Sequence, residues 1–379
     1  MVVRIRFALF LCALLLLVPL PAHVHADGGA PNLAYVSGAA RGIGVIDIFK
    51  QQETATLRVS GDPEMILLSV DGRLLYVTEP ALKQIAVIAT ATKQTLCTAA
   101  YPGHPTLLTL DPGTNTLYTA GTDAPVVEAV DPMTCTVRFR TPTKAPVMGL
   151  AVALIGSGLQ GGTGNQLWVS TRLGLTIFDS SGKQLAQVPL PDQPRSLCIP
   201  PGSMAYVTTE QGTIDAVSLQ SRQVLPGLLT GGSFGPMDYD AATGEVYVPD
   251  RQHHRIDVLS PLASVAAPPP REPLRVIALG GAPQAIAITS DGQLGFIAVQ
   301  DGTVVMVDIP GRSVVNTFHV GGQPHFIITG LYPSFISLTP QQSAFVTILS
   351  NLLHYGAALV VVLAAVIAII INRRKISRS

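Results

Sequence analysis

The segment SVDGRLLYVTEPALKQIAVIA, residues 69–89, carries the two patterns from which the fold of this chain can be predicted. The first is an aromatic residue, Tyr76, followed by small or β-branched residues. The second is the apolar run AVIA at 86–89. Period-two alternation of this kind is typical of β-strands, and Asp71-Gly72 ahead of Tyr76 is typical of a tight turn. The segment therefore predicts a turn followed by two short strands.

The same unit recurs along the chain at intervals of roughly 40 to 50 residues, the length of one propeller blade. Its aromatic residues are Tyr35, Tyr76, Tyr118, Trp168, Tyr206, Tyr247 and Phe296. A second, independent pattern is a proline that introduces an apolar run. These prolines are Pro63, Pro105, Pro146, Pro194, Pro236, Pro283 and Pro324. Two interleaved sets of seven predict a repeat architecture rather than a chance recurrence.

Four short strands per unit, repeated seven times, are the pattern of a seven-bladed β-propeller. We therefore predict an all-β fold over residues 31–334, with the proline-led strand innermost in each blade. The first copy enters at Tyr35 without a proline-led strand, and the run 325–330 has no strand after it. We expect these two parts to complete one blade, so that the N- and C-terminal parts of the repeat region close the ring.

The stretches SVDGRLLYV (69–77), TSDGQLGFI (289–297) and VGGQPHFII (320–328), together with YVTEPALKQIAVIA (76–89), resemble the YVTN family of β-propeller repeats. The resemblance covers about residues 31–330. No copy keeps the asparagine of the family's Tyr-Val-Thr-Asn tetrad. Because propellers host unrelated functions, the resemblance implies the architecture and no particular activity.

The two ends of the chain differ from the repeat region. Residues 1–26 combine Arg4 and Arg6, an apolar run and a small-residue site ending at Ala26, the layout of a secretory signal peptide; an uncleaved N-terminal anchor is the alternative. Residues 350–372 are long and apolar enough to predict a transmembrane helix. Between the propeller and this helix, residues 335–349 are expected to be a juxtamembrane linker.

The basic residues of 373–379 follow the apolar segment at once and predict a cytoplasmic tail. We therefore expect a single-pass type I protein of the cell membrane with an extracytoplasmic propeller. Of 24 basic residues, six lie in the two terminal segments, whereas all 24 acidic residues lie between them. An acidic exported part has no electrostatic attraction to nucleic acid, so no nucleic-acid partner is predicted.

Cysteine usage leaves the pairing open. After the predicted signal peptide only Cys97, Cys135 and Cys198 remain, enough for at most one internal disulfide among three possible pairs. No CxxC spacing for zinc or haem attachment occurs. The sequence predicts a domain that does not depend on a disulfide framework.

Residues beside the inner prolines are expected at the mouth of the central channel. Ordering the repeats around the ring places His325, Glu64 and His104 on three consecutive blades. Two histidines and one carboxylate can bind zinc or iron with an open coordination position, so a divalent metal is one hypothesis. The alternative is that these side chains are solvated and chemically idle. No other cofactor is predicted.

Further polar residues are expected on the same side of the ring, which we name face one. Arg195 follows an inner proline, whereas Arg172 and His253 lie in loops after the aromatic strands. They are candidates for ligand contacts, although charged loop residues are often only solvated. The leading hypothesis is a membrane-anchored platform that binds an extracytoplasmic protein, a glycan or a small ligand. The alternative is an extracytoplasmic metal-dependent hydrolase or lactonase-like enzyme at the channel mouth.

Overall fold

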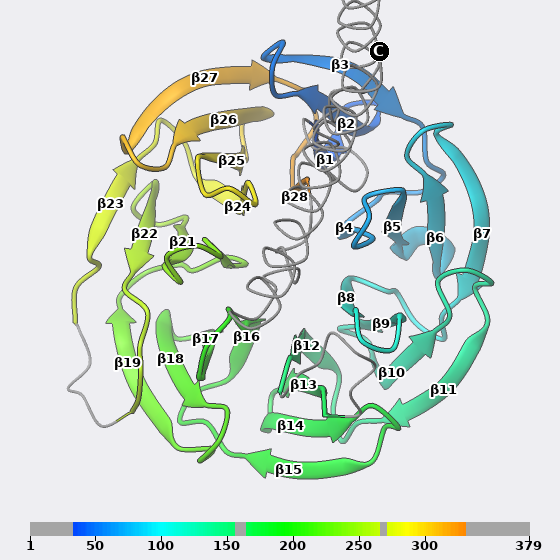
Figure 1. The fold of residues 1–379 in the computed structure, drawn as a ribbon, viewed down its shortest axis with the longest axis vertical. Helices are drawn as coiled ribbons and strands as arrows, with labels where there is room; N and C mark the ends of the chain where they lie inside the picture. The colour runs from blue at the N-terminus through cyan, green and yellow to red at the C-terminus, as the bar shows by residue number, and fades with distance from the viewer. Residues whose placement is uncertain (1–32, 156–163, 266–270, 331–379) are drawn as a thin grey trace, which may run out of the picture. The chain divides into compact units, whose positions relative to one another are not determined.

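The computed structural model describes residues 33–155, 164–265 and 271–330. These residues form seven antiparallel four-stranded sheets arranged as blades around a common axis (Figure 1). The prediction of an all-β, seven-bladed propeller is therefore confirmed. Within these residues there is no α-helix, only the 3₁₀ turn η1 (Pro80–Leu82) between two strands of one blade.

Blades are numbered here along the chain. Blade 1 consists of β28 (Phe326–Thr329), β1 (Leu33–Ala39), β2 (Gly42–Asp47) and β3 (Gln52–Leu57). Blade 2 consists of β4 (Ile66–Leu68), β5 (Leu74–Glu79), β6 (Gln84–Ala89) and β7 (Gln94–Ala100). Blade 3 consists of β8 (Leu107–Asp111), β9 (Thr116–Gly121), β10 (Ala124–Val130) and β11 (Val137–Pro142).

Blades 4 to 7 repeat this order from the inner to the outer strand. Blade 4 consists of β12 (Val147–Ala153), β13 (Gln166–Thr171), β14 (Gly174–Asp179) and β15 (Gln184–Val188). Blade 5 consists of β16 (Pro194–Cys198), β17 (Met204–Thr209), β18 (Thr213–Ser218) and β19 (Val224–Thr230). Blade 6 consists of β20 (Asp238–Tyr239), β21 (Val246–Asp250), β22 (Arg255–Leu259) and β23 (Arg275–Ala278). Blade 7 consists of β24 (Pro283–Ile288), β25 (Leu294–Val299), β26 (Thr303–Asp308) and β27 (Ser313–His319).

The ring closes in blade 1, as the sequence predicted. Strand β28 pairs with β1 in antiparallel register, with Ala34 opposite Thr329 and Ser37 opposite Phe326. The proline-led strands β4, β8, β12, β16, β20, β24 and β28 are the innermost strand of their blades (Figure 1). The pairing of β28 with β1 completes blade 1, and the radial arrangement of blades leaves only short, protected strand edges.

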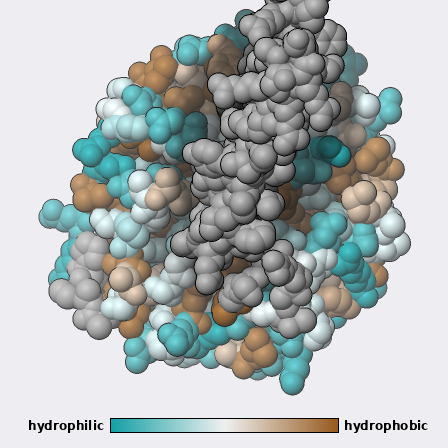
Figure 2. All heavy atoms as spheres, in the orientation of Figure 1, coloured by the Kyte–Doolittle hydropathy of each residue, from teal (hydrophilic) through white to brown (hydrophobic). Residues whose placement is uncertain are grey.

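The core lies between neighbouring blades, because each sheet is apolar on both faces. One cluster joins Tyr35 and Val45 of blade 1 to Ile66 and Val77 of blade 2. The seven repeated aromatic residues are all buried, namely Tyr35, Tyr76, Tyr118, Trp168, Tyr206, Tyr247 and Phe296. Aromatic side chains remove the most apolar surface from water, which explains why this position repeats in every blade. By contrast, hydrophilic and hydrophobic residues are interspersed on the described surface seen in Figure 2.

Blade 6 departs from the predicted pattern, because its inner strand contains only two residues. The strand ends where Asp240 begins a turn, since its carboxylate accepts hydrogen bonds from Ala242 N (2.8 Å) and Thr243 Oγ1 (2.7 Å). Asp238 instead reaches the next blade, where its Oδ2 accepts a hydrogen bond from Ile288 N at 2.7 Å. The side chain of Asp238 thus links the inner strands of blades 6 and 7.

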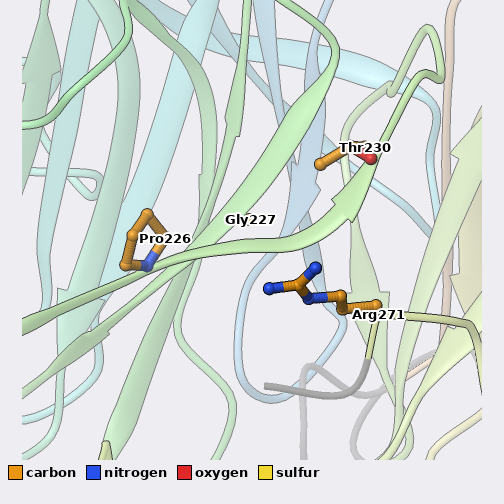
Figure 3. A pocket seen from close by; sticks show the side chains of 4 residues that line it. All are labelled: Pro226, Gly227, Thr230 and Arg271. Atoms are coloured by element: carbon orange, nitrogen blue, oxygen red, sulfur yellow. The ribbon is translucent and has the colours of Figure 1, made fainter. Parts of the chain in front are cut away.

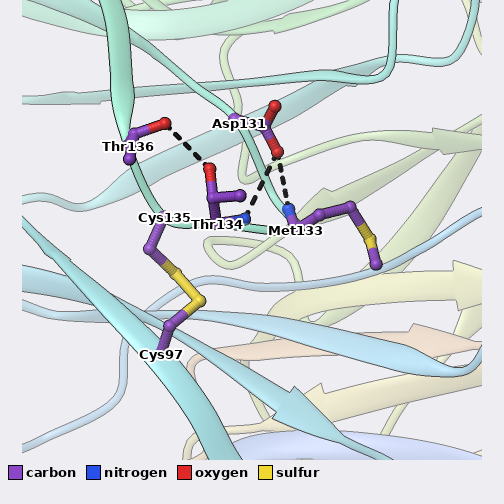
Figure 4. Close-up of a disulfide and its surroundings, with 6 residues drawn as sticks. All are labelled: Cys97, Asp131, Met133, Thr134, Cys135 and Thr136. Atoms are coloured by element: carbon purple, nitrogen blue, oxygen red, sulfur yellow. Dashed lines mark hydrogen bonds between the residues drawn. A yellow bond between two sulfur atoms is a disulfide. The ribbon is translucent and has the colours of Figure 1, made fainter.

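A disulfide joins two neighbouring blades. Cys97 of β7 bonds to Cys135 in the turn between β10 and β11, with Cα atoms 5.9 Å apart (Figure 4). Asp131 shapes this turn, because its Oδ1 accepts hydrogen bonds from Met133 N and Thr134 N. The third cysteine, Cys198, is free and buried. The pairing that the sequence left open is therefore Cys97 with Cys135.

The predicted segments at the chain ends, 1–26 and 335–379, lie outside the described residues. Within the described ranges, no helix is long and apolar enough to cross a bilayer.

Candidate functional site at the inner rim of face one

Face one is formed by two kinds of loops, those that precede the inner strands and those that join the second to the third strand of each blade. Backbone hydrogen bonds connect the two kinds: Tyr101 N donates to Lys83 O (2.8 Å) and Arg251 N to Ser233 O (2.9 Å). The remaining loops form face two, where Leu219 N donates to Ser203 O (2.8 Å). We call the residues around the starts of the inner strands the inner rim of face one.

Glu64 and His325 lie together on this rim, as their places in blades 2 and 1 predicted. Ser37 of β1 connects them, because its carbonyl accepts a hydrogen bond from His325 N (3.1 Å) and its buried hydroxyl donates to Glu64 O (2.5 Å). Gly38 makes this approach possible. It has a φ of 77°, and a Cβ atom there would lie 2.8 Å from the imidazole of His325.

The electrostatic surroundings of the Glu64 carboxyl include charges of both signs. Although the residue is exposed overall, partial loss of solvation raises the pKa of its carboxyl, and Asp62 adds to this effect. His325 acts in the opposite direction and lowers that pKa. His325 is thus close enough to favour the charged form of the Glu64 carboxyl.

His104, in the loop before β8, has a different partner. Its Nδ1 lies 2.5 Å from Oδ2 of Asp123, and its backbone N donates to Oδ1 of the same residue at 2.9 Å. Both side chains are about half exposed, at 52% for His104 and 43% for Asp123. The backbone N and the ring Nδ1 of His104 are therefore both bonded to Asp123 within blade 3.

The metal hypothesis joined His325, Glu64 and His104. Among the described residues, no group of three or more His, Cys, Asp or Glu side chains is arranged to hold a metal ion. Two of the three residues, Glu64 and His325, interact, whereas His104 pairs with Asp123. A metal at this set therefore stays a prediction that metal analysis must decide.

The two loop candidates also differ from each other. Arg172 is exposed in the turn between β13 and β14 and makes no hydrogen bond or ion pair with another described residue. His253 pairs through Nδ1 with Oδ2 of Asp250 at 2.5 Å. Asp250 is buried, and its Oδ1 also accepts hydrogen bonds from the backbone N of Ser233, Gln252 and His253. The Asp250–His253 pair therefore shapes the turn that follows β21.

Sequence reasoning named Arg195 on the rim but missed Arg251, its neighbour in space. Arg195 is the second residue of β16 and is exposed, whereas Arg251 is half-buried in the turn after β21. Burial and the charge of Arg195 both lower the pKa of Arg251. The sequence offered only a weak signal, the cluster of basic residues in DRQHHR at 250–255.

Cys198 and Asp238 lie near each other on the inner strands of the adjacent blades 5 and 6. Burial and the nearby Asp238 raise the pKa of the Cys198 thiol well above its usual value. Burial raises the pKa of the Asp238 carboxyl to about 6. A thiol held in its neutral form is a poor nucleophile, so this pair offers no thiolate chemistry.

A cavity of about 270 Å³ lies away from the rim, beside the outer strand β19. It is lined by Pro226, Gly227, Thr230 and Arg271 (Figure 3). Of these four lining residues, only Arg271 has a titratable side chain. The cavity therefore has less chemical content than the inner rim.

These observations define the class of the protein as a seven-bladed β-propeller with a charged inner rim. No family model matches the chain, and no curated protein is significantly similar to it in sequence. The YVTN resemblance is therefore not shown by these comparisons.

Solved structures support the fold. A protein of unknown function from Desulfotomaculum acetoxidans aligns with a TM-score of 0.64 and 14% identity, over 79% of this chain and 99% of that chain. Hydrazine synthase from Kuenenia stuttgartiensis aligns with a TM-score of 0.61 and 14% identity, over 79% and 97%. The dihydro-heme d1 dehydrogenase NirN in complex with DHE aligns with a TM-score of 0.57 and 14% identity, over 82% and 78%. At such low identity these neighbours show a shared architecture alone.

Proposed function

We propose that this protein is a membrane-anchored, extracytoplasmic binding platform whose inner rim on face one contacts a ligand or a partner. The observation that carries this proposal is the set of charged side chains that several blades place on one rim. Glu64 and His325 come from blades 2 and 1, and Arg195 and Arg251 from blades 5 and 6. A rigid scaffold that presents polar groups from separate loops is a common design for recognition.

An extracytoplasmic location is favoured by the disulfide between Cys97 and Cys135. Disulfides persist in oxidising compartments and are rare in the cytosol. This agrees with the signal peptide and the C-terminal anchor expected from residues 1–26 and 350–372. All three features support export of the propeller followed by retention at a membrane.

Binding is preferred here over metal-dependent hydrolysis. The names of two structural neighbours, NirN and hydrazine synthase, are those of enzymes, so the fold by itself does not decide between binding and catalysis. In the present chain His104 bonds to Asp123 through Nδ1, which leaves its Nε2 available to a metal, but among the described residues no three-ligand set with Glu64 and His325 is assembled. A rim of charged groups needs no such set in order to bind a protein, a glycan or a small ligand.

The test is site-specific photo-crosslinking in intact cells that express the full chain. A photoreactive amino acid replaces Arg172 on face one in one variant and Arg73 on face two in a matched control. Both are exposed arginines in short loops between strands. We expect discrete adducts at position 172 and none at 73. Adducts at position 73 alone, or none at either position in cells grown under varied conditions, would contradict the proposal.

A further inference from the structure

Two arginines on the inner rim have like charges and lack a carboxylate partner. Arg251 and Arg195 are near enough for the charge of one to lower the pKa of the other. Neither forms an ion pair with any residue in 33–155, 164–265 or 271–330. Like charges side by side destabilise a fold unless an opposite charge lies between them.

The guanidinium of Arg251 is also poorly satisfied. Its Nε is buried and has no hydrogen-bond partner among the described residues. Its Nη2 makes one long hydrogen bond, 3.4 Å, to the carbonyl of Gln284 at the start of β24. Most buried donors in folded proteins have a partner, and a bound water or ion is one of the groups that can satisfy a donor such as this one.

The backbone around Arg251 is arranged to make room for this side chain. Gly235 lies beneath it, and a Cβ atom there would lie 3.3 Å from Nη2 of Arg251 and 2.8 Å from Gln284 O. Gly235 is itself fixed, because its N donates to Pro249 O (2.8 Å) and its carbonyl lies 3.4 Å from Ser196 Oγ. Blades 5, 6 and 7 therefore meet around this guanidinium.

The nearest carboxylate in sequence, Asp250, is already occupied. Its Oδ1 accepts hydrogen bonds from three backbone N–H groups, and its Oδ2 pairs with His253 at 2.5 Å. Arg255 lies 3.8 Å from the same oxygen. Asp250 is thus the centre of its own network and does not neutralise Arg251.

We propose that Arg195 and Arg251 form a receptor for a doubly charged oxyanion, a phosphate or a dicarboxylate group of a small ligand, at the inner rim of face one. Two guanidinium groups supply planar arrays of N–H donors that match the oxygens of such a group. An anion between them would neutralise the like charges and accept hydrogen bonds from the two guanidinium groups. The inference deepens the proposed function, on which it rests, by naming the ligand chemistry.

The experiment measures anion binding by isothermal titration calorimetry on the full-length protein in detergent. The probes are inorganic phosphate and malonate, with chloride at matched ionic strength as the reference. We expect phosphate or malonate, but not chloride, to bind, and the preferred probe distinguishes a tetrahedral from a planar oxyanion. Arg195→Gln and Arg251→Gln should each weaken binding about ten-fold or more, because each removes a charged hydrogen-bond donor. Arg73→Gln on face two makes the same charge change and should leave binding unaltered.

Thermal unfolding separates this role from a purely structural one. In anion-free buffer, Arg251→Gln should melt at the same temperature as the wild type or higher, because it removes an unpartnered buried charge. Added phosphate or malonate should raise the melting temperature of the wild type more than that of the variant. If Arg251→Gln does not fold, Arg195→Gln still tests the site, because Arg195 is exposed.

Equal responses to all three anions, or unchanged binding in both arginine variants, would overturn the oxyanion receptor. Such a result, together with crosslinks at position 172, would leave the proposed function standing. Anion binding that depends on Arg195 and Arg251 without any crosslink would support a small-ligand site at the rim and exclude a partner protein bound beside position 172.

Discussion

Blades 3 and 6 each carry an aspartate–histidine pair on face one, yet the two pairs have different roles. In both pairs the carboxylate lies 2.5 Å from Nδ1 of the histidine. The Asp123 side chain in blade 3 is 43% exposed, whereas the Asp250 side chain in blade 6 is 1% exposed. The distance between the groups is the same, so burial decides which pair supports the fold.

The two blades are also attached to their neighbours differently. Blade 3 has an inner strand of five residues and is bonded covalently to blade 2 through Cys135 and Cys97. Blade 6 has an inner strand of two residues and contacts blade 7 through the Asp238 carboxylate and Ile288 N. A disulfide holds blade 3 to blade 2, whereas the buried carboxylates of Asp238 and Asp250 stabilise blade 6. Each of these interactions can be removed by a separate substitution.

The largest expected effect is the loss of the disulfide. Replacing both Cys97 and Cys135 by alanine should lower the free energy of unfolding by about 4 kcal/mol, because a bridge across a separation of 38 residues restricts the unfolded chain. Urea unfolding followed by the fluorescence of Trp168, which is buried, measures this change. Cys198→Ala is the control. A loss no greater than that of the control would show that the bridge does not stabilise blades 2 and 3.

Asp250→Ala should destabilise blade 6 by about 3 kcal/mol, because it leaves three backbone N–H groups without their acceptor, at about 1 kcal/mol each. The same urea experiment measures it, and Asp250→Asn tests whether an uncharged acceptor restores part of the loss. If both variants unfolded like the wild type, burial would not be what separates the two pairs.

Asp238 gives a pH dependence with a defined sign. Because burial raises the pKa of its carboxyl to about 6 from the usual 3.8, the folded state favours the protonated form. Its contribution to stability is full below pH 3.8 and is lost as pH rises through about 6. The wild type should therefore lose up to about 3 kcal/mol relative to Asp238→Asn over this window. Parallel stability–pH curves for the two proteins would contradict this assignment.

The smallest effect is expected for the exposed pair. Asp123→Ala should change the free energy of unfolding by less than about 1 kcal/mol, as is usual for solvent-exposed ion pairs. The urea midpoint at low and at moderate salt measures it. A loss comparable to that of Asp250→Ala would remove the distinction between the two blades.

The fold was accessible from the sequence because its signals are local and repeated. Each blade has an aromatic residue and a proline at equivalent positions of its repeat. The order of the blades alone predicted that His325 and Glu64 are neighbours. Ring closure followed from the incomplete first and last copies. The short inner strand of blade 6 was not predicted, because the spacing of residues does not reveal the hydrogen bonds by which Asp240 begins a turn directly after Tyr239.

The candidate site was only partly accessible for the same reason. Asp123 and Arg251 lie in loops, and their contacts with His104 and with Gln284 depend on loop geometry that residue spacing does not encode. Three cysteines left three possible bridges. Only the lateral alignment of blades 2 and 3 brings Cys97 of an outer strand beside Cys135 of the next outer turn.

The pairing of β28 with β1 has a mechanical consequence. Because the two strands are antiparallel and Ala34 lies opposite Thr329, the first residues of β1 and the last residues of β28 lie at the same end of blade 1. Tension applied between these two points would load the hydrogen bonds one after another, as in opening a zipper, rather than all at once in shear. Under a stretching force, the seam that closes the ring should therefore yield before any other blade.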